Sequence, residues 1–145
     1  MCSRLNKFYT TSLITVSKTI VLIDDDPDDL MVIYESIEQV WDSHTVLSFD
    51  KPESAIKYIL DAGGQVGLII ADVNMPKLNG YQVRQAMLDN GGIFEAISFV
   101  LLSTSKSETD VNKARALNVE AYYKKPITMS GYRDIFLEIK SNHSF

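Results

Sequence analysis

Acidic, hydroxyl and basic side chains follow short apolar runs at four places in the sequence. The acidic cluster has five aspartates within six positions, and a lone aspartate, a hydroxyl cluster and a lysine pair come later. These groups are Asp24–Asp29, Asp72, Ser103–Ser105 and Lys124–Lys125. The apolar runs are typical of buried strands, so the polar groups stand where strands end. If the strands are neighbours, two or three carboxylates, a hydroxyl and an ammonium converge on one pocket.

Carboxylates that converge in this way repel one another, and a proton or a divalent cation relieves the repulsion. An all-oxygen ligand set suits a hard cation, and Mg²⁺ is preferred where few protein ligands are offered and water fills the other positions. A carboxylate beside a metal ion, a lysine and a hydroxyl is also what phosphoryl transfer needs. The cations balance charge on the phosphoryl oxygens while the carboxylate attacks in line.

The elements that must position these groups alternate between strand and helix. Short apolar runs predict five strands, and segments with apolar spacings of three and four predict the helices between them. The strands are expected at Thr19–Ile23, Thr45–Phe49, Gly67–Ala71, Ser98–Leu102 and Ala121–Tyr123. The helices are expected from Pro27 to about Trp41, from Pro52 to a stop at Gly63, and at about Tyr81–Asn90, Glu108–Leu117 and Ser130–Lys140.

Five βα units in succession require a mainly parallel sheet with helices on both faces, because parallel strands need crossover connections. The predicted fold is therefore a single α/β domain with a doubly wound, five-stranded parallel sheet, (βα)5. In such sheets, ligands bind beyond the carboxyl ends of the strands, at the topological switch point. The polar groups described above lie at those ends.

Composition limits the class of protein. The 145 residues fit one domain, and 46% hydrophobic with 23% charged residues are ordinary globular values. A net charge of −5 without a basic block argues against direct binding to nucleic acid or to an anionic membrane. The apolar runs are far shorter than a membrane span of roughly 20 residues. Cys2 is the single cysteine, which excludes an intramolecular disulfide and a Cys/His zinc site and favours a reducing, cytoplasmic location.

Four sequence motifs resemble those of the receiver domain of two-component response regulators. They are IDDDP at Ile23–Pro27, ADVNMPKLNG at Ala71–Gly80, LLSTS at Leu101–Ser105 and YYKKP at Tyr122–Pro126. Four motifs in this order, each at the end of a predicted strand, are specific. The resemblance implies the CheY-like, flavodoxin-like strand order 2-1-3-4-5. We expect a receiver domain over residues 19–141, between a flexible extension at 1–18 and a tail at 142–145.

The resemblance also implies which residues hold the metal ion and accept the phosphoryl group. Asp72 is expected to accept the phosphoryl group as an aspartyl phosphate. Asp24, Asp25 and Asp72 are expected to hold Mg²⁺ with their carboxylates, and Asn74 with its backbone carbonyl.

Two further residues are expected to contact the phosphoryl group, and a third to respond to it. By the resemblance, the hydroxyl of Thr104 hydrogen-bonds the phosphoryl oxygen, and Lys125 pairs with it across a cis bond to Pro126. Tyr122 is expected to be the switch aromatic that turns inward as Thr104 moves. Gly80 is expected to supply a positive φ or a close backbone approach.

The function implied by the resemblance is a signalling module in a phosphorelay, not an enzyme. A sensor histidine kinase or a phosphotransfer protein would supply the phosphoryl group. The chain ends some five residues after the last predicted helix, so we expect a stand-alone receiver that signals through a changed protein-binding surface. Both a monomer and a phosphorylation-dependent dimer fit the sequence.

The same residues also have simpler interpretations. Asp26, Asp28 and Asp29 are expected to be solvated residues of a helix start, stabilised by the helix dipole. Thr104 has the alternative of capping a helix, and Tyr122 that of half-buried filling. The acidic run also matches an EF-hand loop at Asp24, Asp26, Asp28 and Glu35, but Asp29 stands where that loop needs glycine.

Two other classes of protein use a similar sheet. A haloacid-dehalogenase-like phosphatase also forms an aspartyl phosphate with Mg²⁺, but its first-strand pattern D-x-D-x-T would need threonine where Asp28 stands. A flavodoxin-type flavin binder needs a Ser/Thr/Gly phosphate cradle, and the first loop here is acidic. The phosphorylated residue separates the first alternative: Asp72 indicates a receiver and Asp24 a phosphatase.

Overall fold

The computed structural model describes residues 17–143, so the flexibility expected of the N-terminal extension and the last two residues of the expected tail lie outside the described part. The strands are β2 (Thr19–Ile23), β3 (Val46–Phe49), β4 (Val66–Asp72), β5 (Ser98–Ser103) and β6 (Ala121–Lys124). The helices are α2 (Pro27–Val40), α3 (Pro52–Ala62), the 3-10 turn η1 (Gly63–Gln65), α4 (Gly80–Asn90), α5 (Gly92–Ala96), α6 (Glu108–Ala116) and α7 (Met129–Asn142). None of these helices has both the length and the apolar character needed to cross a bilayer.

The strands form one sheet in the order β3-β2-β4-β5-β6, and every neighbouring pair is parallel. In chain order this is the predicted arrangement 2-1-3-4-5, so the doubly wound fold is confirmed. The chain moves outward from β2 to β3 on one side and then returns to β4 on the other. The switch point therefore lies between the carboxyl ends of β2 and β4.

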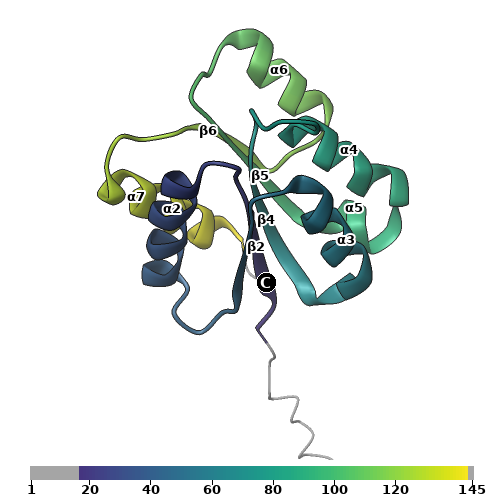
Figure 1. Ribbon diagram of the computed structural model, residues 1–145, viewed down its shortest axis with the longest axis horizontal. Coiled ribbons are helices and arrows are strands. Elements are labelled where there is room, and N and C mark those ends of the chain that lie inside the picture. The colour runs from purple at the N-terminus through teal and green to yellow at the C-terminus, as the bar shows by residue number, and fades with distance from the viewer. Residues whose placement is uncertain (1–16, 144–145) are drawn as a thin grey trace, which may run out of the picture.

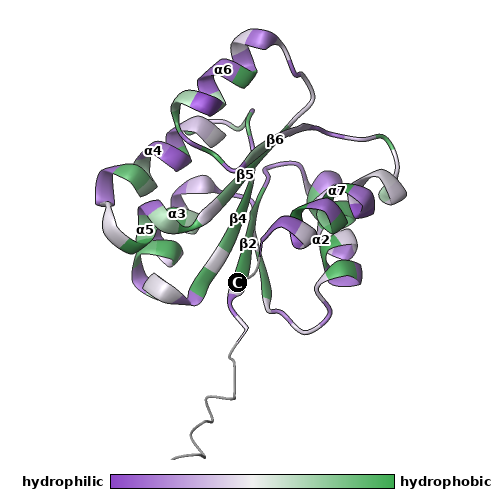
Figure 2. Cartoon of the chain, turned by 180° about the vertical axis from the view of Figure 1, so that it is seen from behind, coloured by the Kyte–Doolittle hydropathy of each residue, from purple (hydrophilic) through white to green (hydrophobic). Residues whose placement is uncertain are grey.

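Two helical layers cover the sheet, with α2 and α7 on one face and α3, α4 and α6 on the other (Figure 1). Successive residues of a strand point to opposite faces of the sheet. In β2, Val21 and Ile23 pack on the face covered by α3 and α4, and Ile20 and Leu22 pack on the face covered by α2 and α7. Figure 2 shows the central strands as mainly hydrophobic between helices that carry hydrophilic stretches. A strand buried on both faces must be apolar throughout, which explains the continuous runs in the sequence.

Some elements extend beyond their predicted ends. β4 includes Asp72 and β5 includes Ser103, so both polar residues belong to the sheet instead of the loops that follow. The short helix α5 was not predicted, because five residues are too few to show an apolar period. It begins after Gly91, whose φ of 60° turns the chain sharply at the end of α4.

Candidate functional site

The carboxyl end of β2 places the first two aspartates. The backbone N–H of Asp24 donates to the carbonyl of Phe49 at 3.1 Å, which continues the pairing of β2 with β3 past the last strand residue. The Asp24 carboxylate in turn accepts the N–H of Asp26 at 3.0 Å. Asp26 caps α2, since its side chain accepts the N–H groups of Asp28 and Asp29. The turn from β2 to α2 is therefore held by its own aspartates.

The carboxyl end of β4 places Asp72, which is the last residue of the strand. The loop between β4 and α4 returns to the end of β4, because the N–H of Gly80 donates to the carbonyl of Val73 at 3.0 Å. A Cβ on Gly80 would lie 2.6 Å from the carbonyl oxygen of Asp72 and 2.7 Å from Leu101 Cδ2. Gly80 has no positive φ, so of the two roles expected for it the close backbone approach is the one found.

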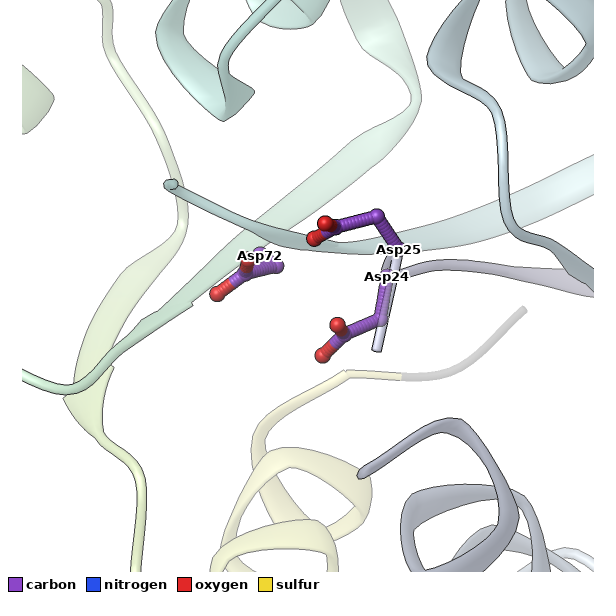
Figure 3. Close-up of side chains that lie close together, drawn as sticks. All are labelled: Asp24, Asp25 and Asp72. Carbon is purple, nitrogen blue, oxygen red and sulfur yellow. The ribbon is translucent and has the colours of Figure 1, made fainter. Parts of the chain in front are cut away.

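Asp24, Asp25 and Asp72 bring one carboxylate oxygen each to within 4.8 Å of one another. Figure 3 shows Asp24 and Asp25 on the segment after β2, with their carboxyl groups directed to the same side as that of Asp72. Asp24 and Asp72 are buried, whereas Asp25 is exposed. Three carboxylates with one open side fit a hard divalent cation that retains water ligands. The donor set can therefore hold a metal ion.

Lys125 brings a positive charge into this cluster from the loop after β6. Its Nζ lies 2.9 Å from Asp24 Oδ2, 3.0 Å from Asp72 Oδ1 and 2.8 Å from Asp29 Oδ2. Its backbone N–H donates to the carbonyl of Ser103 at 2.7 Å, which fixes the residue beside the end of β5. The ammonium donates hydrogen bonds to Asp24 and Asp29 and forms an ion pair with Asp72.

Two expectations about this corner of the site are wrong. Asp29 is not a solvated residue of the helix start, because its carboxylate pairs with Lys125. The bond between Lys125 and Pro126 is not cis, since no peptide bond within residues 17–143 is cis. The trans form is the intrinsically favoured one before proline, by about 0.5–1 kcal/mol. Three carboxylates, and not a cis bond, hold the lysine side chain in the pocket.

Burial, hydrogen bonds and neighbouring charges shift the pKa values of three groups in the site. Burial raises the pKa of Asp24, against the hydrogen bonds from Asp26 and Lys125. Burial, assisted by the charge of Asp24, raises the pKa of Asp72 to about 6. Burial alone would lower the pKa of Lys125, but the hydrogen bonds to Asp29 and Asp24 outweigh it and raise that pKa. The carboxylates outnumber the ammonium, so the pocket favours an additional cation.

These side chains line a cavity of about 240 Å³. Its walls are formed by Asp24, Asp25, Asp26, Asp29, Asp72, Asn74, Thr104 and Lys125. All six residues that the sequence proposed for the metal ion and the phosphoryl group are therefore in one place. Thr104 is exposed at the rim and does not cap α6, because Ser107 accepts the N–H of Asp110 and is the cap.

Tyr122 is not part of the wall of this cavity. The residue is only 8% exposed, and its hydroxyl donates a 2.8 Å hydrogen bond to the carbonyl of Ser105. Ser105 directly follows Thr104, so the aromatic ring and the hydroxyl residue are joined through one loop.

Asp29 is the site residue that the sequence analysis did not assign. It precedes Ile33 and Ile37 by one and two helical turns, and both isoleucines are buried on the side of α2 that faces the sheet. An acid on the apolar stripe of a helix, at the end nearest a strand terminus, was the signal that could have identified it.

Comparisons of the sequence and of the fold with known proteins point to the same family. The model of the response regulator receiver domain matches residues 20–136, a range that includes every residue proposed for the site. Response regulator Rcp1 from Synechocystis sp. is 26% identical over 133 residues, which are 88% of this chain and 88% of Rcp1. Two solved structures share the fold.

The crystal structure of the phosphorylated cyanobacterial phytochrome response regulator RcpA aligns with a TM-score of 0.76 at 26% identity, over 87% of this chain and 93% of RcpA. The Mn²⁺-bound form of response regulator Rcp1 aligns with a TM-score of 0.72 at 23% identity, over 86% of this chain and 92% of that one. Since the family model spans most of the sequence and the sheet has the same strand order, the chain belongs to the response regulator receiver domain family.

Proposed function

We propose that this receiver domain, residues 19–141, accepts a phosphoryl group on Asp72 in a Mg²⁺-dependent reaction. The donor would be a phosphohistidine of a sensor histidine kinase or of a phosphotransfer protein. The observation that carries the proposal is the position of Asp72, which is buried within 4.8 Å of two other carboxylates and 3.0 Å from Lys125. A nucleophilic carboxylate that faces both an ammonium and a place for a cation is arranged for phosphoryl transfer.

The transfer itself follows from the groups on the wall of the cavity. An oxygen of the ionised Asp72 carboxylate forms a bond to phosphorus as the bond to the donor nitrogen breaks. Lys125 donates hydrogen bonds to the phosphoryl oxygens, and the Thr104 hydroxyl donates another from the rim. With a pKa of about 6, Asp72 is mainly ionised at pH 7 and is ready to attack.

Asp24, Asp25 and Asp72 would hold the Mg²⁺ ion, with the backbone carbonyl of Asn74 as a fourth protein ligand. The bound ion supplies positive charge to the oxygens of the transferring group. The Mn²⁺-bound form of Rcp1 and the phosphorylated form of RcpA support both parts of the proposal, because each is a response regulator with this fold.

The output would be a changed protein-binding surface over α6, β6 and α7. Thr104 would move toward the phosphoryl group, and Ser105 would move with it. Because Ser105 accepts the hydrogen bond of Tyr122, the displacement would reach β6 directly. Phosphorylation would then shift the population between two arrangements of this surface.

Incubation with a small-molecule phosphodonor tests the metal dependence. We expect one acid-labile and base-labile phosphoryl group per chain in the presence of Mg²⁺ and none in the presence of a chelator. Asp25→Asn should need more Mg²⁺ for the same rate, whereas Asp28→Asn, which removes the same charge from an exposed residue, should behave like the wild type. An equal rate with and without the divalent cation would contradict the proposal.

A further inference from the structure

Asp29 is one of three carboxylates that contact Lys125, and it is the one that lies outside the group of three that can hold a metal ion. Its Oδ2 is 2.8 Å from the lysine Nζ, and its side chain is 38% exposed, against 1% for Asp24 and 6% for Asp72. Lys125 is therefore shared between two buried acids that belong to the cation group and one half-buried acid that does not.

We propose that Asp29 is a positioning residue that keeps the ammonium of Lys125 beside Asp72 when a divalent cation takes up the oxygens of Asp24 and Asp72. This inference rests on the proposed cation site and adds a residue to it. The same two carboxylates serve the lysine and the cation, so the two positive groups compete for them. Asp29 gives the lysine a partner for which the cation does not compete.

The fold places Asp29 firmly enough for this role. Its backbone N–H donates to the cap residue Asp26 at 3.3 Å, in the first turn of α2. The favourable end of the helix dipole stabilises a negative charge there without a metal ion. One turn later Ile33 is fully buried, so the helix face that carries Asp29 is packed against the sheet.

Loss of the Asp29 carboxylate is expected to weaken the binding of the cation. Without Asp29, a cation that takes the oxygens of Asp24 and Asp72 leaves a lysine with 8% side-chain exposure and no anionic partner. Cation binding must then displace the ammonium from the pocket. Residues that orient the direct ligands of a metal ion typically change its affinity by about 10-fold to 100-fold, and we expect roughly tenfold weaker Mg²⁺ binding for Asp29→Asn.

The chain offers a matched control in Asp28. This neighbouring aspartate is exposed in the same helical turn, and the structure of residues 17–143 shows no ion pair for it. Asp28→Asn and Asp29→Asn remove the same charge from adjacent positions. A general loss of negative potential would weaken Mg²⁺ binding in both variants, whereas the proposed role concerns Asp29 alone.

The experiment is a Mg²⁺ titration of the wild type, Asp28→Asn and Asp29→Asn, followed by NMR. Backbone amide shifts give the dissociation constant, and the ¹⁵N–¹H signal of the Lys125 ammonium reports whether this group stays protected from exchange with water. We expect the ammonium signal to persist with Mg²⁺ in the wild type and in Asp28→Asn, and to disappear in Asp29→Asn. Asp29→Glu, which keeps the charge, should restore part of the affinity.

Equal dissociation constants for Asp28→Asn and Asp29→Asn, with a protected lysine signal in both, would overturn the inference. No phosphodonor is present in this titration, so the result does not depend on phosphoryl transfer. A wild type that binds Mg²⁺ but takes no phosphoryl group would contradict the proposed function, and the contrast between the two variants would still decide the role of Asp29.

Discussion

The hydroxyl of Tyr122 donates a 2.8 Å hydrogen bond to the carbonyl oxygen of Ser105. Ser105 lies in the loop between β5 and α6, directly after Thr104 at the rim of the acidic cavity. The ring of Tyr122 is buried with the core between the sheet and helices α3, α4 and α6. The structure therefore has this aromatic ring inward and hydrogen-bonded to the loop that carries Thr104, and the movement expected of the ring on phosphorylation stays a prediction.

Tyr122→Phe removes that bond and keeps the ring. We expect a loss of about 1 kcal/mol in the free energy of unfolding, measured in urea, and altered amide signals at Ser105 and Lys106. Tyr123→Phe is the control, because that hydroxyl bonds the exposed side chain of Glu138 instead of a loop carbonyl. If both variants leave the signals of the Thr104 loop unchanged, Tyr122 does not hold this loop.

Gly80→Ala tests the close approach of the loop to Asp72. The new Cβ would meet the carbonyl oxygen of Asp72 at 2.6 Å, so the backbone must move. We expect a loss of about 1–3 kcal/mol in stability, as for other overpacked sites, together with weaker Mg²⁺ binding. Gly64→Ala is the control, since its Cβ would meet nothing within 4 Å. Unfolding and Mg²⁺ titrations that do not distinguish the two variants would show that the loop adapts without disturbing Asp72.

Asp72→Asn should stabilise the protein at pH 7 when Mg²⁺ is absent. Burial and the charge of Asp24 raise the pKa of Asp72 from 3.8 to about 6, so the folded state holds this proton more tightly than the unfolded state does. The associated stability is fully present below pH 3.8 and is lost as the pH rises through about 6. Asparagine stays neutral, and its advantage at pH 7 has an upper bound of roughly 3 kcal/mol.

Urea unfolding of both proteins between pH 4 and pH 7, with a chelator present, measures this difference. We expect the advantage of Asp72→Asn to shrink steadily as the pH falls from about 6 toward 4. Saturating Mg²⁺ should remove or reverse the advantage at pH 7, because the cation needs the ionised carboxylate. An asparagine variant that is less stable at pH 7 than the wild type without Mg²⁺ is the opposite of this expectation.

Arg84 is a buried cation that binds backbone carbonyls instead of an acid. Its guanidinium donates to the carbonyls of Leu117, Asn118 and Glu95, at 3.0, 3.2 and 3.3 Å, and lies over the ring of Phe99. It thereby joins α4 to the end of α6.

Arg84→Met would leave these acceptors without their donor, and we expect a loss of about 2–3 kcal/mol in the free energy of unfolding. Arg115→Met, at an exposed arginine on α6, should cost less than about 0.5 kcal/mol. Similar losses of unfolding free energy in the two variants would show that water replaces Arg84 as the donor to these backbone carbonyls.

The fold was predictable because its strands are buried on both faces. Runs such as Ile20–Ile23 must be apolar at every position, and this leaves a clear pattern in the sequence. The same logic located Asp24, Asp72 and Lys125, since the ends of parallel strands meet at one edge. It was less accurate at the strand ends, because the polar side chains of Asp72 and Ser103 look like loop residues while their backbones belong to the sheet.

The rest depended on contacts between residues far apart in the sequence. Asp29 pairs with a lysine 96 positions later, and local spacing shows only that it begins a helix. Arg84 was not singled out, because a charged residue on a helix is ordinarily exposed and its carbonyl partners come from other segments. The cis bond before Pro126 was implied by the family resemblance, whereas the structure has a trans bond and holds Lys125 by three ion pairs with residues far away in the sequence.

The position of the phosphoryl group is the most direct test of the account. After incubation with a phosphodonor and Mg²⁺, borohydride reduction converts an aspartyl phosphate to homoserine, and peptide mass spectrometry then identifies the residue. We predict homoserine at position 72 in the wild type and at no position in Asp72→Asn. Homoserine at position 24 would indicate a phosphatase-like nucleophile on the first strand, and this result, or modification of Asp72→Asn to the same extent, would contradict the account.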